Sequence, residues 1–315
     1  MFKIGIVGAG IMIKDHINGI LKNENCQLTM VADIDIEKAK EAAKETGAIA
    51  YVDYHDFCKD PDNKPDVVIV NLPHFLHKEV TIYFLENKVN VLVEKPMAMN
   101  KQECLEMIEA AKKNGVKLGV GHVQQYFGSN KRLKEIIDSN RLGKLIRMIE
   151  TRNADYFTGR PKWFVDKKYS GGGMIMNYGA HTLDRIFYLT GKKLIKTHSV
   201  ISNNLNDCTI EEGAQILAEF SDDFSAAISY SGCEHSSEHI ARFYFTKGIV
   251  MVTGNKIMIN ENKEWTEEIY DNNINVDEIK NMILWLSDKE NSITAPEHGM
   301  QVIEGIEMIY AEGNI

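Results

Sequence analysis

Short runs of β-branched and other apolar residues alternate with longer helical patterns over roughly the first 121 residues. Segments 36–46 and 101–114 are examples of the helical patterns, since they are rich in Ala, Glu and Lys and carry apolar residues at helical spacing. The expected strands are residues 3–7, 28–32, 67–70, 89–93 and 117–120. This alternation predicts a series of βαβ units, and therefore a doubly wound parallel sheet of the Rossmann type with helices on both faces.

The pattern changes after Gly143 to longer runs in which apolar and polar residues alternate. Two pairs, Asp222-Asp223 and Lys247-Gly248, resemble the turns between such strands. Strands are expected at residues 144–152, 214–220, 224–230 and 240–245, and helices at 275–286 and 296–312. The fold class is therefore α/β, with an N-terminal domain over residues 1–121 and a C-terminal α+β domain over residues 122–315 that contains a large, mostly antiparallel open sheet.

The formal net charge of −9 over 315 residues opposes binding to a phosphate backbone, so no nucleic-acid partner is expected. The five cysteines are an odd number without a CxxC pair, which indicates reduced thiols in place of a disulfide framework or a zinc knuckle. Met1 leads within two residues into an apolar strand, and no run of 18 apolar residues occurs. We expect a cytoplasmic protein with no signal peptide and no membrane span.

A Gly-Ala-Gly sequence at residues 8–10 follows the first expected strand directly and opens a helix. Backbone N–H groups and the helix dipole at such a place can hold a pyrophosphate, so Gly8, Gly10, Ile11 and Met12 are candidate contacts of a dinucleotide. Ile13 stands where the usual GxGxxG pattern has its third glycine. That glycine allows close packing of helix and strand, so we expect Ile13 to push the helix outward and to affect cofactor affinity.

Asp33 ends the second expected strand at a distance that suits hydrogen bonds to the ribose diol of an adenosine. No arginine follows at once to favour a 2'-phosphate, so NAD is preferred over NADP. The alternative role for Asp33 is that of a turn or cap residue, but Asp35 already serves as the expected N-cap before Ile36. We therefore expect Asp33 to contact the cofactor.

Two further segments follow expected strands at the edge of the sheet where ligands bind. Asn71, Leu72 and Pro73 come after the strand at 67–70 and open a helix, in whose first turn a proline is tolerated. His77, a few residues on, could contact the cofactor or be a packed or solvated histidine, and His122 after the strand at 117–120 has the same two interpretations. All five residues are candidate cofactor contacts.

The tripeptide Glu94-Lys95-Pro96 ends the strand at 89–93. A lysine delivered to this edge of a parallel sheet directs its ammonium group at the bound ligand, which makes Lys95 the first catalytic candidate. A solvated lysine before a turn proline would have the same sequence. Glu94 is expected to steady the lysine or to contact the cofactor ribose.

A glycine-rich segment in the second half of the chain precedes another group of polar residues. The three glycines at 171–173 permit close approach of the backbone. The residues after them have helical spacing, which places Asn177 and His181 on one face at i,i+4 and Asp184 about a turn further. His181 could instead be a satisfied histidine of the core. This face offers too few ligands for a metal ion, so none is expected.

In this order along the chain, these motifs resemble the family of glucose-fructose oxidoreductase, inositol dehydrogenase and MocA, which are sugar and polyol dehydrogenases. The resemblance spans nearly the whole sequence and depends on the glycine loop at 8–10, Asp33, Asn71-Leu72-Pro73 with His77, Glu94-Lys95-Pro96, and the segment from Ser170 to His181. The chain has Asn177 where the family often has Asp, and Gln125-Tyr126 where the family has an arginine-aromatic pair.

The resemblance implies an NAD(P)-binding domain over residues 1–121 and a substrate-binding and oligomerisation domain over residues 122–315. The open sheet of the second domain would form the contacts of a homodimer or homotetramer. The resemblance further implies that Lys95 and His181 flank the nicotinamide and the substrate, and that the peptide before Pro96 is cis.

We expect hydride transfer between a hydroxyl of a sugar, inositol or related polyol and the nicotinamide. His181 would be the general base, Lys95 would stabilise charge on the reacting oxygen, and Asn177 would orient the substrate. Further candidates for the sugar pocket are Tyr126, Arg160, Trp163 and Asp184. The alternatives are a glycoside hydrolase that uses NAD for a transient oxidation and a non-catalytic sensor of dinucleotide or sugar; the presence of both Lys95 and His181 favours a catalyst.

Overall fold

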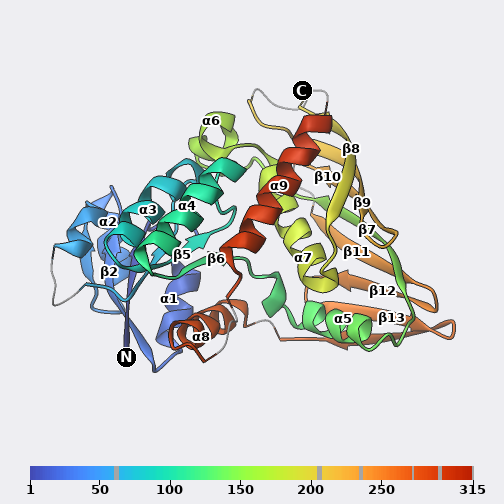
Figure 1. Cartoon of the computed structure of the whole chain (residues 1–315), viewed down its shortest axis with the longest axis horizontal. Coiled ribbons are helices and arrows are strands. Elements are labelled where there is room, and N and C mark those ends of the chain that lie inside the picture. Colours follow the sequence, from blue (N-terminus) through green and yellow to red (C-terminus); the bar gives the residue numbers. More distant parts are fainter. Residues whose placement is uncertain (60–63, 204–207, 234–236, 272, 290–292, 314–315) are drawn as a thin grey trace. The chain divides into compact units, whose positions relative to one another are not determined.

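The computed structural model of the chain describes residues 1–59, 64–203, 208–233, 237–271, 273–289 and 293–313. It divides into two compact units. Unit 1 comprises Met1–Val123 and Asn273–Gln301, and unit 2 comprises Gln124–Asn272 and Val302–Ile315. The elements of both units are labelled in Figure 1.

The sheet of unit 1 is parallel throughout, in the order β3-β2-β1-β4-β5-β6. Its strands are β1 (Phe2–Val7), β2 (Cys26–Ala32), β3 (Ile49–Tyr51), β4 (Val67–Val70), β5 (Asn90–Glu94) and β6 (Leu118–Gly121). The strand order reverses between β1 and β4, as in a doubly wound fold. The expected parallel sheet is confirmed, and β3 is a sixth strand that the sequence did not indicate.

Two helices of unit 1 begin at residues whose side chains cap them. Asp35 accepts a hydrogen bond from the Glu37 amide and begins α2, as expected, and Asn100 does the same for α4 through the Glu103 amide. The helices are α1 (Ile13–Leu21), α2 (Ile36–Ala43), α3 (His77–Glu86), α4 (Lys101–Asn114) and α8 (Ile274–Leu286), with short 3₁₀ turns η1 (Tyr54–Cys58) and η2 (His74–Leu76). These caps fix where the helices meet the loops at the strand ends.

Helix α8 belongs to unit 1 although it lies far along the chain. It packs on α1, and an added Cβ on Gly19 would lie 2.5 Å from the Asn275 carbonyl oxygen, so only glycine fits there. Ile13 is buried in the same apolar cluster as Ile279. The functional division expected from the sequence, 1–121 and 122–315, stays a prediction. The compact units have other boundaries, because α8 packs on α1 and therefore belongs to unit 1.

The sheet of unit 2 has the order β14-β13-β12-β11-β7-β10-β9-β8. Its strands are β7 (Leu145–Asn153), β8 (Leu194–Ser202), β9 (Gly213–Phe220), β10 (Phe224–Ser231), β11 (Glu238–Phe245), β12 (Gly248–Thr253), β13 (Lys256–Glu261) and β14 (Glu264–Ile269). Within the described residues the pair of β7 and β10 is parallel and the other pairs are antiparallel. The expected large, mostly antiparallel sheet is confirmed, and the positive φ angles of Asp222 and Asp223 confirm the turn between β9 and β10.

One face of this sheet is covered and the other is open. Strand β9 shows the pattern clearly, because alternate residues from Ala214 to Phe220 are buried. Helices α5 (Gly128–Asp138) and α7 (Ala180–Thr190) lie on the covered face (Figure 1). The remaining helical segments of the unit are η3 (Gln124–Tyr126), η4 (Lys162–Val165), α6 (Lys167–Ser170), the π-helix η5 (Ile175–Gly179) and most of α9 (Pro296–Glu312).

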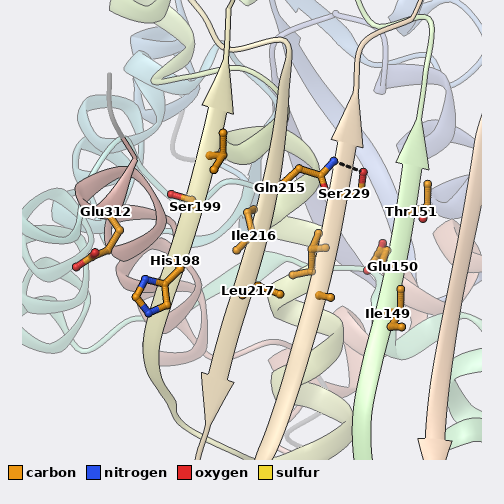
Figure 2. A pocket seen from close by; sticks show the side chains of 13 residues that line it. Ile149, Glu150, Thr151, His198, Ser199, Gln215, Ile216, Leu217, Ser229 and Glu312 are labelled. Atoms are coloured by element: carbon orange, nitrogen blue, oxygen red, sulfur yellow. Dashed lines mark hydrogen bonds between the residues drawn. The ribbon is translucent and has the colours of Figure 1, made fainter.

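The open face carries a shallow hollow of about 450 Å³ (Figure 2). Its lining includes Ile149, Leu217 and Gln215, whose amide donates a hydrogen bond to Ser229. None of the candidate catalytic residues lines this hollow. Among the helices that the structure describes, none is both long and apolar enough to cross a membrane.

Candidate active site

The glycine loop of unit 1 is tightly held on one side and open on the other. Gly8 has a φ of +101°, and a Cβ there would lie 2.1 Å from the Asn71 carbonyl oxygen, so the loop requires glycine. The side-chain amide of Asn71 donates a hydrogen bond of 2.9 Å to the Gly8 carbonyl oxygen. Gly10 has no atom within 4 Å of an added Cβ, and Ile11 is 72% exposed. The open side of this cradle fits the phosphates of a dinucleotide, which would approach the backbone there.

Asp33 holds the same loop from the end of β2. Its Oδ2 accepts a hydrogen bond of 2.8 Å from the Ala9 amide, and its Oδ1 accepts one of 2.9 Å from the Asp35 amide. Asp33 therefore acts as a turn residue, which was the alternative role considered for it from the sequence. Each carboxylate oxygen can accept a further hydrogen bond, so the predicted contact with an adenosine ribose remains compatible with this geometry.

His77 is fully buried and lies between two loops of the site. Its Nδ1 is 2.9 Å from the Pro96 carbonyl oxygen, and its Nε2 is 2.8 Å from the Leu72 carbonyl oxygen. Burial lowers its pKa, against the opposing effect of these carbonyls, so the imidazole is neutral and donates only one of the two hydrogen bonds. We assign His77 to positioning of the loops at Leu72 and Pro96; its predicted contact with the cofactor stays a prediction.

Lys95 follows β5 directly, and the Lys95–Pro96 peptide bond is cis, as the resemblance implied. The Lys95 side chain is half-buried, and its backbone amide donates a hydrogen bond of 3.1 Å to Glu94 Oε2. His122 follows β6, is almost fully buried, and lies edge-to-face with the ring of His298. The sequence placed Glu94, Lys95 and His122 at the carboxyl ends of neighbouring strands, and the structure has them there.

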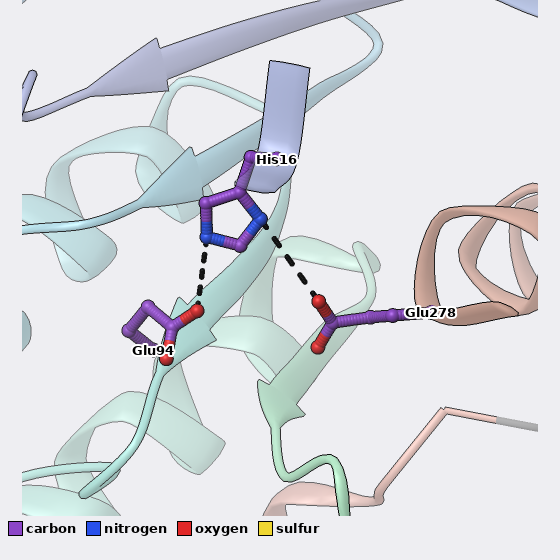
Figure 3. Close-up of side chains that lie close together, drawn as sticks. All are labelled: His16, Glu94 and Glu278. Atoms are coloured by element: carbon purple, nitrogen blue, oxygen red, sulfur yellow. Dashed lines mark ion pairs between the residues drawn. The ribbon is translucent and has the colours of Figure 1, made fainter. Parts of the chain in front are cut away.

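Glu94 belongs to a cluster with His16 and Glu278, two residues that the sequence did not indicate. His16 of α1 lies with Nε2 2.9 Å from Glu94 Oε1, and its Nδ1 is 3.9 Å from Glu278 Oε2 of α8 (Figure 3). Burial lowers the pKa of His16, but the hydrogen bond and charge of Glu94 outweigh it and raise the pKa above its usual value. Burial and the charge of Glu94 raise the pKa of Glu278 to about 7. His16, Glu94 and Glu278 thus share protons in the interior of unit 1.

These three side chains also have the types and spacing of metal ligands, because one ligand atom of each lies within 4.8 Å of the others. A protonated His16 already balances the charge of Glu94, so the cluster is satisfied by protons alone. The prediction that the face of Asn177 and His181 holds no metal is a separate matter and stays a prediction.

In unit 2 a buried carboxylate holds the glycine-rich segment. Glu211 accepts hydrogen bonds from the amides of Gly173 and Ile175, at 2.9 and 2.8 Å, and from the Tyr310 hydroxyl at 2.8 Å. A Cβ on Gly173 would lie 2.1 Å from the Glu211 carbonyl oxygen, which explains the glycine. Glu211 therefore fixes the start of the helical segment that carries Asn177 and His181.

That segment differs from the regular helix that its spacing predicts. Residues Ile175–Gly179 form a π-helix, which continues into α7 at Ala180. Such π-turns within helices occur frequently at functional sites. Asn177 is buried, whereas His181 is half-buried and is followed on α7 by a run of buried residues from Thr182 to Phe187. The π-turn thus gives His181 its access at the start of an otherwise enclosed helix.

Aromatic rings and one arginine, Arg160, gather in the part of unit 2 that contains Asn177. Tyr156 is buried near Asn177, and burial raises its pKa well above the usual value, so its hydroxyl stays protonated. The guanidinium of Arg160 lies 4.7 Å from the Phe164 ring centroid, and Trp163 packs edge-to-face on that ring. The structure therefore brings the predicted residues Arg160, Trp163 and Asn177 into one part of unit 2, and adds Tyr156 and Phe164, which the sequence did not indicate.

The other two predicted sugar-pocket residues are buried. Tyr126 is 4% exposed, and its hydroxyl accepts a hydrogen bond of 3.2 Å from Gln125. Asp184 is 3% exposed on α7, next to Arg185. Their predicted contacts with substrate stay predictions.

A parallel sheet with a glycine loop at the end of its first strand, followed by a unit built on an open sheet, defines the class of dinucleotide-binding oxidoreductases. Residues 2–122 match the model of the oxidoreductase family with an NAD-binding Rossmann fold, and residues 130–251 match the GFO/IDH/MocA C-terminal domain. The chain therefore belongs to the GFO/IDH/MocA family, as its motifs suggested, and carries that family's NAD-binding domain.

Two relatives and one solved structure illustrate the match. The chain is 30% identical over 235 residues to a 1-carboxy-3-chloro-3,4-dihydroxycyclohexa-1,5-diene dehydrogenase of Comamonas testosteroni, covering 74% of this chain and 58% of the relative. It is 30% identical over 203 residues to the D-glucoside 3-dehydrogenase of Escherichia coli, covering 62% of this chain and 56% of the relative. The structure of GenD2 from gentamicin A biosynthesis in complex with NAD superposes with a TM-score of 0.88 at 20% identity, over 99% of this chain and 93% of that one, which supports the fold. The chain thus spans a little over half the length of these curated relatives.

Proposed function

We propose that this protein transfers a hydride between a hydroxyl-bearing carbon of a sugar, inositol or related polyol and NAD. The observation that carries the proposal is the half-buried His181, which the π-turn presents at the start of α7 in a chain of this oxidoreductase family. A relative named for oxidation of a D-glucoside supports a carbohydrate substrate. The family match supports NAD as the cofactor.

The residues divide the chemistry between them. NAD, which the glycine loop at residues 8–10 and Asp33 would hold, would supply the acceptor for the hydride of the carbinol carbon. His181 removes the hydroxyl proton, because an imidazole exchanges protons near neutral pH. The ammonium group of Lys95 donates a hydrogen bond to the same oxygen and stabilises its developing negative charge. Asn177, near the buried Tyr156, orients the substrate, while Glu94 fixes the backbone at Lys95.

The first experiment is a screen of sugars, inositols and their keto forms with NAD and with NADP, read by the absorbance of the reduced nicotinamide. On the best substrate, Lys95→Met and His181→Asn should each lower kcat by about 10²- to 10⁴-fold. Binding of NAD, measured by titration calorimetry, should stay within a few-fold. The matched control is Lys113→Met, which alters an exposed residue of unit 1 and should leave kcat unchanged.

Other outcomes would point elsewhere. Near-normal turnover by either site variant would refute the roles assigned to Lys95 and His181. Release of a sugar from a glycoside without net formation of NADH would identify a hydrolase that uses transient oxidation. Tight dinucleotide or sugar binding without hydride transfer to any substrate of the panel would identify a sensor.

The open face of the unit 2 sheet is the surface for a second copy of the chain. It exposes the apolar residues Ile149, Ile195, Val200 and Leu217, of which Leu217 is 60% exposed. A homodimer or homotetramer would cover them. Leu217→Arg should shift the mass measured by light scattering to the monomer, whereas Leu21→Arg, at a residue of unit 1 that is 55% exposed, should not. The five free cysteines favour a reducing compartment such as the cytoplasm.

A further inference from the structure

Arg152 of β7 is a cation on the covered face of the unit 2 sheet. In the register of the sheet it lies between Tyr230 on β10 and His239 on β11. Its guanidinium carbon is 3.7 Å from the centroid of the Tyr178 ring, so the group lies against this ring. Arg152 is half-buried. Stacking on an aromatic face fixes the plane of a guanidinium and leaves its N–H groups to point outward from the ring edge.

The carboxylate of Glu150 attracts Arg152 electrostatically, but both of its oxygens are paired with other residues. Glu150 Oε2 lies 2.5 Å from Arg185, and Glu150 Oε1 lies 2.8 Å from His239 Nε2. Burial would raise the pKa of Glu150, but the charge of Arg185, the hydrogen bond from His239 and the charge of Arg152 lower it to about 2, so Glu150 is an anion. Burial lowers the pKa of His239, which is therefore neutral at neutral pH. Glu150 is then a single negative charge beside the two guanidinium groups of Arg185 and Arg152, so one positive charge is left over.

Within the part of the chain that the structure describes, no carbonyl or carboxylate oxygen accepts a hydrogen bond from Arg152. Arginine stays charged at every pH at which proteins fold, and it has five N–H donors in a fixed fork. Holding such a group partly out of water without an acceptor is unfavourable. The fork matches the two oxygens of a carboxylate, or two of the oxygens of a phosphate.

Arg152 is connected to the candidate site through aromatic rings. Tyr178 directly follows Asn177 in the π-helix, and its ring lies edge-to-face with Tyr156 at 5.4 Å. Tyr156 also has Arg160 near it, with the guanidinium 5.6 Å from the ring centroid. Two cations therefore flank a pair of aromatic rings next to the residue expected to orient the substrate. Aromatic faces suit the apolar faces of a sugar ring.

We infer that Arg152 forms a subsite for a negatively charged group of the substrate, so that the substrate class is a sugar or cyclic polyol bearing a carboxylate or a phosphate. The inference rests on the proposed function for the kind of molecule. For its charge it rests on the guanidinium of Arg152, which has no hydrogen-bond acceptor among the described residues, and on the excess positive charge around Glu150. Arg160, near the Tyr156 ring, adds to the positive potential. Arg152 is thus a determinant of specificity and takes no part in the hydride transfer.

The test is direct binding of matched ligands by titration calorimetry, at fixed ionic strength, with and without NAD. The probes are glucose, glucuronate and glucose 6-phosphate. We expect at least one of the two anions to bind about 10- to 100-fold more tightly than glucose. Arg152→Met should remove this preference and leave glucose binding unchanged, and Arg152→Lys should retain part of it. Arg147→Met, which alters an exposed arginine of the same strand, is the control and should change nothing.

Preference for glucuronate would identify a carboxylate ligand, and preference for glucose 6-phosphate a phosphate ligand. Equal binding of all three sugars by the wild type would overturn the inference. Parallel loss of glucose and anion binding in both Arg152 variants would overturn it too, because it would show that Arg152 only supports the fold. If anions bind in a way that depends on Arg152 but no substrate is turned over, the subsite is supported and the proposed oxidation is refuted. If neutral sugars are turned over without any preference for anions, the oxidation is supported and the subsite is refuted.

Discussion

Replacing Arg185 by Met should strongly destabilise unit 2, because it would leave the carboxylate of Glu150 buried without its main counter-charge. Both side chains are about 97% or more removed from solvent, and they lie 2.5 Å apart. The pKa of Glu150 falls from 4.5 to about 2 in the folded protein. At about 1.4 kcal/mol per pH unit, this corresponds to a contribution of about 3 kcal/mol at neutral pH. Removal of one partner of a buried ion pair commonly costs about 3–5 kcal/mol, which agrees.

The pH dependence of this contribution has a definite sign. The folded pKa of Glu150 lies below its usual value, so the stabilisation is complete above pH 4.5 and is lost as the pH falls towards about 2. Wild-type protein should therefore lose stability in this window more steeply than Arg185→Met. The double variant Glu150→Gln with Arg185→Met should recover part of the loss at neutral pH, since it leaves no buried charge, and the double-mutant cycle gives the coupling of the pair.

The assay is urea unfolding at several pH values, followed by far-UV circular dichroism and by the fluorescence of Trp163 and Trp265, which both lie in unit 2. The matched control is Arg141→Met, which breaks an ion pair of 2.6 Å with Glu261 at the surface. Such exposed pairs contribute less than about 1 kcal/mol. If Arg185→Met cost no more than this control, the reasoning about the buried pair would be refuted.

Three further changes test other features. The folded pKa of Glu278 is raised to about 7, so wild type should lose thermal stability as the pH rises from about 4.5 to 7 and the neutral carboxyl group ionises. Glu278→Gln cannot ionise and should remove this loss. An unchanged pH profile of the melting temperature would contradict the proton sharing. Glu211→Gln should lower stability by about 1–3 kcal/mol in urea unfolding and reduce kcat, because its amide group would face N–H donors; unaltered unfolding would argue against its role. Gly8→Ala should weaken NAD binding in calorimetry by more than tenfold, since its Cβ would overlap the Asn71 carbonyl, whereas Gly10→Ala has open space and should perturb the loop less.

Much of the fold could be predicted because the elements of unit 1 have strong local patterns. The strand β4 is a run of four fully buried β-branched residues, and α4 has both an asparagine cap and a terminal glycine with positive φ. Strand β3 has only three residues, and most residues of β8 and β14 are exposed, so these strands lack the alternation that a sequence reveals. The π-turn at Ile175–Gly179 keeps the composition of a helix and therefore looked like one.

The site was only partly predictable, for a different reason. Residues such as Lys95, Asn71 and Asp33 follow strands directly, and the ends of parallel strands are where ligands bind. Glu278 and Glu211 depend on partners tens to hundreds of residues away, and nothing in their local sequence marks them. The usual glycine pattern places a glycine for close helix packing at position 13, where this chain has Ile13. In the structure the close helix packing in unit 1 occurs at Gly19, where α1 meets α8.

The covering of α1 by α8 has a consequence for synthesis and for engineering. The nucleotide-binding unit lacks one of its packing layers until residues Ile274–Leu286 have been translated, so residues 124–272 of unit 2 must be synthesised before this unit can complete its interior. A recombinant fragment that stops at Val123 would expose the apolar side of α1 to water. Chimaeras that exchange cofactor modules between relatives should transplant both gene segments together.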